Sequence, residues 1–290
     1  MEKEQLSSFK QRELIHNGES SRIYRLGDGR VLKVAKDVVF ESCKLLNIDY
    51  EAKISDTRAH VIDGIVCPLS AVYSNKMCVG YTMDEVKGKS LNEYDENYTL
   101  QQKSDLDAYF RLYTKIEELV ARANKLCIVM PDLCTCDNII FTPEGKVKLI
   151  DYDGMQIGNN DRAIALSTSL GDPLKYVVSP KYVNGYFHFT KELDKTSLTI
   201  LMFLWIFNVN LLRVGEYNPY THSFVSIKDV FDLLGIEDET FMKKVDANLS
   251  LDHKGSYLSD DLYRITQRYD MMSAMIPGMK DQCIKKLIKK

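Results

Sequence analysis

Three polar residues in the middle of the chain have side chains that could act together on a metal ion. Asp132 and Asn138 lie in a polar loop, and Asp151 follows the mainly apolar strand-like segment Val-Lys-Leu-Ile at residues 147–150. Between them, Pro-Glu-Gly at 143–145 predicts a turn that folds these segments into a β-hairpin. The hairpin would let the three side chains converge on one point. Two carboxylates and an amide oxygen are hard ligands of the kind that Mg²⁺ prefers, together with water and substrate phosphates.

Each of these residues also has an ordinary structural explanation. Asp and Asn side chains close turns and cap loops, so Asp132 or Asn138 alone could be a turn residue. Asp153 lies two residues beyond Asp151 and is an alternative metal ligand. The functional interpretation therefore depends on the joint position of these residues around one hairpin.

A lysine near the N-terminus is the candidate cation for this site. Residues 31–35, Val-Leu-Lys-Val-Ala, alternate like a β-strand, which puts Lys33 on the same face as Val31 and Ala35. A lone lysine on a strand usually extends along the surface into water. Lys36 is the alternative, on the opposite face of the strand.

The elements that must position these side chains follow from the hydrophobic pattern. In the N-terminal part, the predicted elements are a β-hairpin at 22–26 and 31–35 around a Gly-Asp-Gly turn, a helix at 40–60, and strands at 65–74 and 77–83. On the helix, Ile48, Glu51 and Ile54 share one face, because they are spaced by three residues.

Beyond a hinge near residues 84–88 the chain becomes mainly helical. A helix is predicted at 100–123, a β-rich patch at 127–157, and further helices from 193 onward. We therefore expect an α+β protein with a small β lobe at residues 1–86 and a larger helical lobe at 87–290.

In the order and type of these motifs the chain resembles the protein-kinase-like superfamily, in a divergent, bacterial or phage-type form. Asp132 lies where the family has its catalytic-loop aspartate, and Asn138 where it has a metal-binding asparagine. Asp151 resembles the aspartate of the Asp-Phe-Gly motif, and Lys33 the lysine of the third strand. Glu51, eighteen residues later (51 − 33), lies where the family places the ion-pair partner of that lysine.

The resemblance implies one bilobal kinase domain, with a small antiparallel β-sheet and one helix in the N-lobe and a mostly helical C-lobe. It implies ATP and Mg²⁺ as cofactors. Lys33, held by Glu51, would contact phosphate, Asn138 and Asp151 would hold the metal, and Asp132 would act as the catalytic base.

The rest of the implied ATP site lies in the N-terminal part. Residues 82–86 resemble the fifth strand and the hinge, and residues 16–24 resemble a glycine-rich loop that keeps one central glycine. The implied nucleotide-binding residues besides Lys33 are Gly18, Ser20, Ser21, Ile23, Ala35, Met83, Asp84, Glu85 and Val86.

Several positions depart from the family pattern. Met130-Pro131 replaces the His-Arg before the catalytic aspartate, and the loop from Asp132 to Asn138 is one residue longer than usual. Ser179-Pro180-Lys181 lies where Ala-Pro-Glu is expected. These departures bear on the substrate and the rate more than on the fold.

Composition excludes several other classes of protein. Of the 290 residues, 38 are Lys or Arg and 41 are Asp or Glu, so a net charge of −3 gives no electrostatic reason to expect a nucleic-acid partner. The longest apolar run, at 198–207, has about half the length that a membrane span needs. No apolar signal segment is seen at residues 1–11, and seven scattered cysteines are typical of reduced thiols. We therefore expect a cytoplasmic protein without a membrane span.

The predicted function is an ATP- and Mg²⁺-dependent phosphotransferase, most simply a serine/threonine protein kinase. The segment at 155–180 is as long as a protein kinase's activation segment, which favours a protein acceptor. Lys181 favours the alternative of a small-molecule kinase of the aminoglycoside or choline type. A pseudokinase that acts as a binding module is the second alternative. The oligomeric state does not follow from the sequence.

Overall fold

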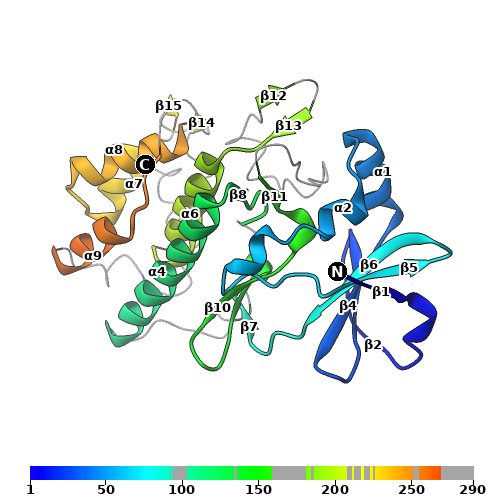
Figure 1. The fold of residues 1–290 in the computed structure, drawn as a ribbon. Helices are drawn as coiled ribbons and strands as arrows, with labels where there is room; N and C mark the ends of the chain where they lie inside the picture. Colours follow the sequence, from blue (N-terminus) through cyan, green and yellow to red (C-terminus); the bar gives the residue numbers. More distant parts are fainter. Residues whose placement is uncertain are drawn as a thin grey trace. The chain divides into compact units, whose positions relative to one another are not determined.

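The described part of the chain is a mixed α+β structure. This computed structural model describes residues 1–91, 93, 103–133, 136–158, 181–183, 186–207, 211, 217–218, 223–224, 226–250 and 255–268. Strands predominate in the N-terminal part and helices towards the C-terminus (Figure 1). The α+β class predicted from the sequence is thereby confirmed.

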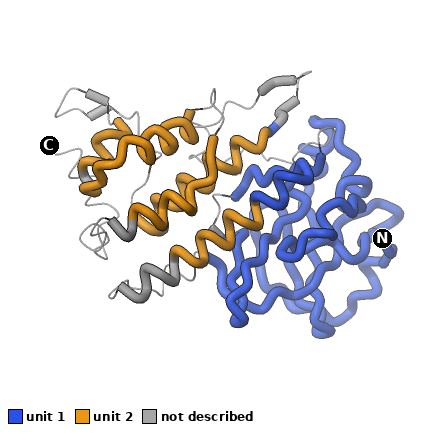
Figure 2. The backbone as a smooth tube through the Cα atoms, turned by 60° about the vertical axis from the view of Figure 1, so that its left-hand side comes forward, with its two compact units in different colours: residues 1–91, 121–171, 180–189 blue, residues 92–120, 172–179, 190–290 orange. Residues whose placement is uncertain are grey.

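The chain divides into two compact units (Figure 2). Unit 1 consists of residues 1–91, 121–171 and 180–189, and unit 2 of residues 92–120, 172–179 and 190–290. This division does not follow the boundary expected between residues 86 and 87. The reason is that strand β7 (Lys89–Ser90) pairs with β9 (Ile139–Phe141), and Ile65 forms a β-bridge with Leu149. The hairpin that carries the candidate metal ligands therefore belongs to the same unit as Lys33.

A six-stranded sheet with the order β1-β5-β6-β4-β3-β2 forms the first part of unit 1. Its strands are β1 (Glu2–Gln5), β2 (Glu13–Asn17), β3 (Ser21–Arg25), β4 (Arg30–Ala35), β5 (Ser70–Ser74) and β6 (Met77–Asp84). The predicted hairpin around Gly-Asp-Gly is confirmed as β3 and β4. The sheet expected to be antiparallel has one exception, because β1 pairs parallel to β5. Strand β1 was not predicted, because its sequence, Glu-Lys-Glu-Gln, is polar throughout and lacks the alternation of apolar residues typical of a strand.

Alternation along β4 sends its side chains into two layers. Val31 and Ala35 join a core cluster with residues from the helices that follow β4, whereas Leu32 packs with Val72 and Val79 in a second cluster. Because successive strand residues point to opposite faces, Lys33 lies on the face of Val31 and Ala35, as predicted. Its side chain is thereby directed among buried residues and away from solvent.

The helix predicted over residues 40–60 is divided into shorter pieces. Helix α1 (Asp37–Leu46) ends at Asn47, which has a left-handed φ of 50°. Helix α2 (Tyr50–Ile54) begins after Asp49, whose carboxylate accepts a hydrogen bond from the Ala52 N–H at 3.1 Å. The 3-10 helix η2 (Arg58–Val61) follows. Asn favours the left-handed position that ends a helix and Asp the cap that begins one, which explains the break.

The β-rich patch predicted at 127–157 is confirmed as short paired strands. Strand β8 (Ile128–Val129) pairs with β11 (Gln156–Ile157), and β9 pairs with β10 (Val147–Leu149), all antiparallel. The 3-10 helix η3 (Cys136–Asn138) leads into β9, and η4 (Tyr152–Gly154) follows β10. A further antiparallel pair in unit 1 is β12 (Lys181–Val183) and β13 (Tyr186–His188).

Helices make up most of the described part of unit 2. They are α6 (Lys191–Trp205), α7 (Ile227–Leu234), α8 (Glu239–Leu249), α9 (Ser259–Arg268) and the N-terminal part of α4 (Lys103–Lys125), with the short antiparallel pair β14 (Tyr217–Asn218) and β15 (Ser223–Phe224). The rings of Phe203, Phe231 and Phe241 lie in contact between α6, α7 and α8. The predicted helical character of this region is confirmed.

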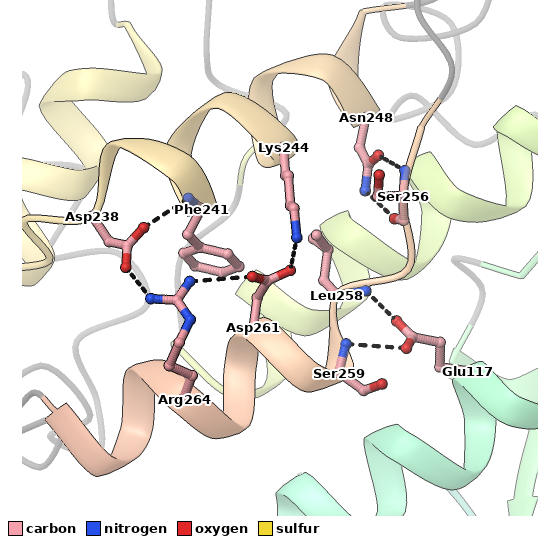
Figure 3. A network of polar contacts seen from close by, with 10 residues as sticks. All are labelled: Glu117, Asp238, Phe241, Lys244, Asn248, Ser256, Leu258, Ser259, Asp261 and Arg264. Atoms are coloured by element: carbon pink, nitrogen blue, oxygen red, sulfur yellow. Dashed lines mark hydrogen bonds and ion pairs between the residues drawn. The ribbon is translucent and has the colours of Figure 1, made fainter.

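Charged side chains connect α8 to α9 (Figure 3). Arg264 of α9 pairs with Asp238, the residue that caps α8, and also with Asp261, at 3.1 Å. Lys244 of α8 pairs with Asp261 at 2.6 Å. From α4, the buried carboxylate of Glu117 accepts hydrogen bonds from the N–H groups of Leu258 and Ser259, at 2.7 and 3.0 Å. These hydrogen bonds and ion pairs hold the N-terminal part of α9 to α4 and α8.

The described helices also bear on the membrane and cysteine predictions. None of them is long and apolar enough to cross a membrane. Within the same described ranges, Cys43, Cys67, Cys78 and Cys127 are free thiols. Cys134 and Cys283 lie outside the described residues.

Candidate functional site

Lys33 is a buried ammonium with two carboxylate partners. Its side chain is 5% exposed and forms ion pairs with Asp151 and, at 2.6 Å, with Asp153. Lys33 comes from β4, and the two carboxylates come from the segment that follows β10. Residues 64–66, which precede β5 of the same sheet as β4, form backbone hydrogen bonds with Leu149 of β10. A lysine is rarely buried unless it is paired. The surface interpretation of this lysine is therefore wrong.

Asp153 is the most enclosed member of this group. Besides Lys33, it accepts hydrogen bonds from the hydroxyl groups of Tyr81 at 2.8 Å and Tyr50 at 3.2 Å. Its side chain is 5% exposed, whereas that of Asp151 is 30% exposed. One carboxylate is thus fixed on three sides and the other is open to solvent.

The electrostatics of the group follow from burial and pairing. Burial opposes the charged form of Lys33, but Asp151 and Asp153 outweigh it and hold the pKa of Lys33 above its usual value. Burial likewise opposes ionisation of Asp153, but the Lys33 ammonium and the hydrogen bonds from Lys33 and Tyr81 hold its pKa below the usual value. Burial, followed by the charge of Asp153, raises the pKa of Tyr50 and of Tyr81. The cluster therefore consists of one ammonium between two carboxylates, with neutral tyrosine hydroxyl groups as further donors to Asp153.

The predicted ion pair between Lys33 and Glu51 is wrong for this structure. Glu51 pairs with Lys3 of β1 at 2.7 Å, and both side chains are exposed. The break at residues 47–49 sets the register of α2, so Tyr50, one residue earlier, faces the buried cluster. Adjacent residues on a helix do not share a face, which is why only one of the two can point inward.

Asp132, Asn138 and Asp151 line one small cavity, as the sequence predicted. The Asn138 amide nitrogen donates to the Asp132 carboxylate at 3.1 Å, and the Ile150 N–H donates to the Asn138 backbone carbonyl at 3.0 Å. The cavity holds about 20 Å³ and is also lined by Gly154. That volume suits one water molecule or one ion.

Asp151 is one of the non-glycine residues with a left-handed backbone. The residue has φ 68° and ψ 49°, in the left-handed region that non-glycine residues seldom adopt. Gly154 lies against its carboxylate, because a Cβ atom on Gly154 would come within 2.5 Å of Asp151 Oδ2. Strain of this kind persists where the surrounding structure enforces it, and such positions cluster at functional sites.

The donor atoms around the cavity fit a magnesium ion. No group of three or more His, Cys, Asp or Glu side chains that could hold a metal occurs among the described residues. The set here consists of two carboxylates and an amide, and Mg²⁺ is usually bound by one or two carboxylates and completes its shell with waters and phosphates. Since the Asn138 nitrogen donates to Asp132, its amide oxygen is the atom left for a cation.

The segment predicted as a degenerate glycine-rich loop is the turn between β2 and β3. The Lys36 N–H donates to the Ser20 carbonyl at 2.9 Å, and its ammonium donates to the Gly18 carbonyl. Ser21 is buried at the start of β3. Lys36, the alternative to Lys33, therefore holds this turn and does not enter the buried cluster.

The predicted nucleotide-binding apolar residues share one cluster. Ala35 and Met83 are buried members of it, and Ile23, Val86 and Ile150 are partly buried against it. Asp84 is exposed at the end of β6, and Glu85 pairs with Arg25 at 2.7 Å while its N–H donates to the Gly29 carbonyl at 2.9 Å. The hinge residues are thus anchored to the β3–β4 hairpin.

Sequence reasoning missed several contributors to this site. Tyr50, Tyr81 and Gly154 were not singled out, and Asp153 was considered only as a metal ligand. The signals available were the closeness of Asp153 to Asp151 and the helix-ending Asn47 that sets the register of Tyr50. Most of the segment at 155–180 lies outside the described residues.

A scan against models of known protein families finds no match, and a search of curated proteins finds none either.

Proposed function

We propose that this chain is an ATP- and Mg²⁺-dependent phosphotransferase with a protein-kinase-like bilobal fold. The observation that carries the proposal is the buried Lys33 ammonium beside Asp151, whose carboxylate lines a cavity together with Asp132 and Asn138. A cation for phosphate, oxygen ligands for a metal and a carboxylate for the acceptor proton are the parts that phosphoryl transfer needs. All four residues belong to unit 1.

Each of these residues has a distinct role in the proposal. The Lys33 ammonium binds phosphate oxygens of ATP, and Asp151 and Asn138 hold the metal. Bound there, Mg²⁺ would neutralise charge on the phosphate oxygens. Asp132 orients the acceptor hydroxyl and accepts its proton on a carboxylate oxygen. Because the groups are held by a strand, a hairpin and a strained turn, positioning is their main contribution.

The apolar cluster around Ala35 supports a place for the adenine ring. Ile23, Val86 and Ile150 keep part of their surface exposed while they pack on this cluster. Ligand sites are mainly apolar with a few placed polar groups. The backbone after Met83 and the turn at Gly18 and Ser20 are the proposed polar contacts.

The proposed acceptor is a serine or threonine of a protein. The length of the segment at 155–180 favours it, and Lys181, at the start of β12, favours a small-molecule acceptor. Retention of Lys33, Asp132, Asn138 and Asp151 argues against a pseudokinase. ATP and a hydroxyl-bearing substrate are accordingly the proposed partners.

The test is incubation with Mg²⁺ and γ-labelled ATP, with the label followed into the chain itself, into generic protein substrates and into small hydroxyl compounds. We expect transfer that depends on Mg²⁺ and is abolished in Asp151→Asn. The matched control is Asp63→Asn, which removes an exposed carboxylate that pairs with Lys148 of β10 at 2.7 Å.

The outcomes separate the candidates. Label on small hydroxyl compounds alone supports the small-molecule kinase. Nucleotide binding without any transfer supports the binding module. Absence of both contradicts the proposal.

A further inference from the structure

The two carboxylates at Lys33 differ in how freely they can exchange partners. Asp151 is 30% exposed, lines the cavity and sits on a strained backbone. Asp153 is 5% exposed and does not line that cavity. A carboxylate that faces a cavity can turn to a new ligand, whereas a buried one cannot leave its donors without a large desolvation penalty.

Asp153 is held by donors from three elements of unit 1. Lys33 comes from β4, Tyr81 from β6 and Tyr50 from α2, with donor–acceptor distances of 2.6, 2.8 and 3.2 Å. Charge-assisted hydrogen bonds of this kind are stronger than neutral ones. The position of the carboxylate relative to Lys33 is therefore determined by the sheet and by the helix together.

Residues of α2 and of η2 after it, other than Glu51, contact the segment that contains Asp153. The buried Lys53 ammonium donates to the Met155 carbonyl at 2.6 Å, and Arg58 donates to the Ile157 carbonyl at 2.6 Å. These contacts join the region of α2 to the segment that carries Asp153. Glu51 meanwhile pairs with the exposed Lys3.

We infer that Asp153 is the positioning residue for Lys33, in the place that Glu51 was expected to fill, and that Asp151 is its exchangeable partner. The inference rests on the proposed function and deepens it. When Asp151 turns towards a metal ion, Asp153 keeps the ammonium in place, so Lys33 never becomes a buried unpaired charge. Binding of ATP phosphates then depends on Asp153 and not on Glu51.

The first test compares Asp153→Asn with Glu51→Gln, each of which replaces a carboxylate by an amide of similar shape. Asp153→Asn is expected to raise KM for ATP by roughly ten- to hundredfold, the size of a lost charge-assisted hydrogen bond. Glu51→Gln should change KM and kcat by less than about twofold, since exposed pairs contribute little. A tenfold rise in Glu51→Gln, or an unchanged KM in Asp153→Asn, would overturn the inference.

The second test does not depend on phosphoryl transfer. Thermal unfolding is measured for Lys33→Met combined with Asp153→Asn and, separately, with Glu51→Gln. Residues in contact give non-additive shifts, and distant ones give additive shifts. We expect Asp153→Asn to lower Tm much less in the Lys33→Met background than in the wild type, and Glu51→Gln to lower it equally in both.

The kinetic measurement and the unfolding measurement test different hypotheses. A wild type that neither binds nor transfers nucleotide contradicts the proposed function, while the unfolding cycle still decides whether Asp153 holds Lys33. Additive shifts for Lys33 and Asp153 overturn the inference even in an active enzyme. If Asp153→Asn does not fold, the milder Tyr81→Phe, which removes one donor to Asp153 and keeps the charge, takes its place. Additive shifts for Tyr81→Phe with Lys33→Met would then count against the inference.

Discussion

Two charged networks, one in each unit, use similar residues in different ways. In unit 2, Arg264 and Lys244 pair with Asp238 and Asp261 (Figure 3). Both cations keep more than a third of their side chains exposed. In unit 1, the single ammonium of Lys33 is buried and faces two carboxylates. The four unit 2 side chains named here sum to zero charge, whereas Lys33 and its two carboxylates carry one excess negative charge.

The difference indicates which network is structural. The carboxylate of Asp238 also accepts the Phe241 N–H at 2.9 Å, so it completes a helix as well as an ion pair. The side chain of Asp151, in contrast, caps no helix, and the backbone of this residue is strained. Excess charge beside a cavity is what a bound cation would neutralise. We therefore expect substitutions in unit 1 to affect activity and those in unit 2 to affect stability.

After the loss of transfer expected in Asp151→Asn, the largest effect is expected for Asp132→Asn. An amide cannot accept the proton of an acceptor hydroxyl, so turnover should fall by roughly 10²- to 10⁴-fold, while nucleotide binding is retained. Initial rates and a nucleotide titration measure the two properties. Asp137→Asn is the control, because Asp137 is exposed and contacts the Ser90 hydroxyl at 3.3 Å. Full activity in Asp132→Asn with a loss in Asp137→Asn would reassign the base.

The second prediction concerns the pH dependence of stability in Lys33→Met. In the wild type the pKa of Asp153 is lowered from 3.8, so its contribution is present above that pH and is lost as the pH falls through the folded value. Without the ammonium, burial dominates and raises the pKa of Asp153. Stability is then greatest at low pH and is lost as the pH rises through that higher pKa. At neutral pH the variant should lose about 3–5 kcal/mol.

The measurement is Tm between pH 8 and pH 5 in the presence of a chelator. We expect Tm of Lys33→Met to rise relative to the wild type as the pH falls. Lys228→Met, at an exposed residue of α7, should follow the wild type. Parallel curves for Lys33→Met would show that the buried carboxylates are not held by this lysine.

Two glycines provide the third and most direct comparison of the units. A Cβ atom at Gly154 would meet Asp151 Oδ2 at 2.5 Å, and one at Gly255 would meet Asn248 Oδ1 at 2.7 Å. Gly154→Ala should displace the proposed metal ligand and lower turnover by about ten- to hundredfold, because small misplacements are costly in catalysis. Gly255→Ala should lower Tm and leave the turnover of folded enzyme unchanged. Equal effects on turnover would remove the distinction between the units.

Much of the site could be predicted because its residues lie on locally determined elements. The Gly-Asp-Gly turn and the alternation of residues 31–35 determine the face of Lys33, and the hairpin at 139–149 brings Asp132, Asn138 and Asp151 to one cavity. Short turns set the register of their strands, so one sequence suffices to recognise them.

The partner of Lys33 could not be predicted in the same way. Which residue pairs with Lys33 depends on the register of α2, because a shift by one residue would exchange Tyr50 and Glu51. Asn47, which ends α1, and Asp49, which caps α2, set that register. The pairing also joins Lys33 to Asp153, more than a hundred residues later in the sequence. The parallel strand β1 was missed for a related reason, because its pairing with β5 is long-range and its sequence is polar. Such pairings arise from tertiary packing, which local propensity does not encode.

The smallest effect is expected for Asp238→Ala in unit 2. This substitution removes the side-chain cap of α8 and one partner of Arg264, while Asp261 still pairs with that arginine. Loss of a helix cap costs about 0.5–2 kcal/mol, which corresponds to a decrease in Tm of a few degrees. The matched control is Lys228→Ala, which breaks an exposed pair with Asp232 and should leave Tm unchanged within error. Because Asp238 caps α8 and pairs with Arg264 in unit 2, whereas the proposed site belongs to unit 1, the rate of phosphotransfer per folded molecule should equal that of the wild type. A clear loss of turnover in Asp238→Ala at full folding would mean that the balanced network also supports the reaction, and the separation of roles between the two units would then be wrong.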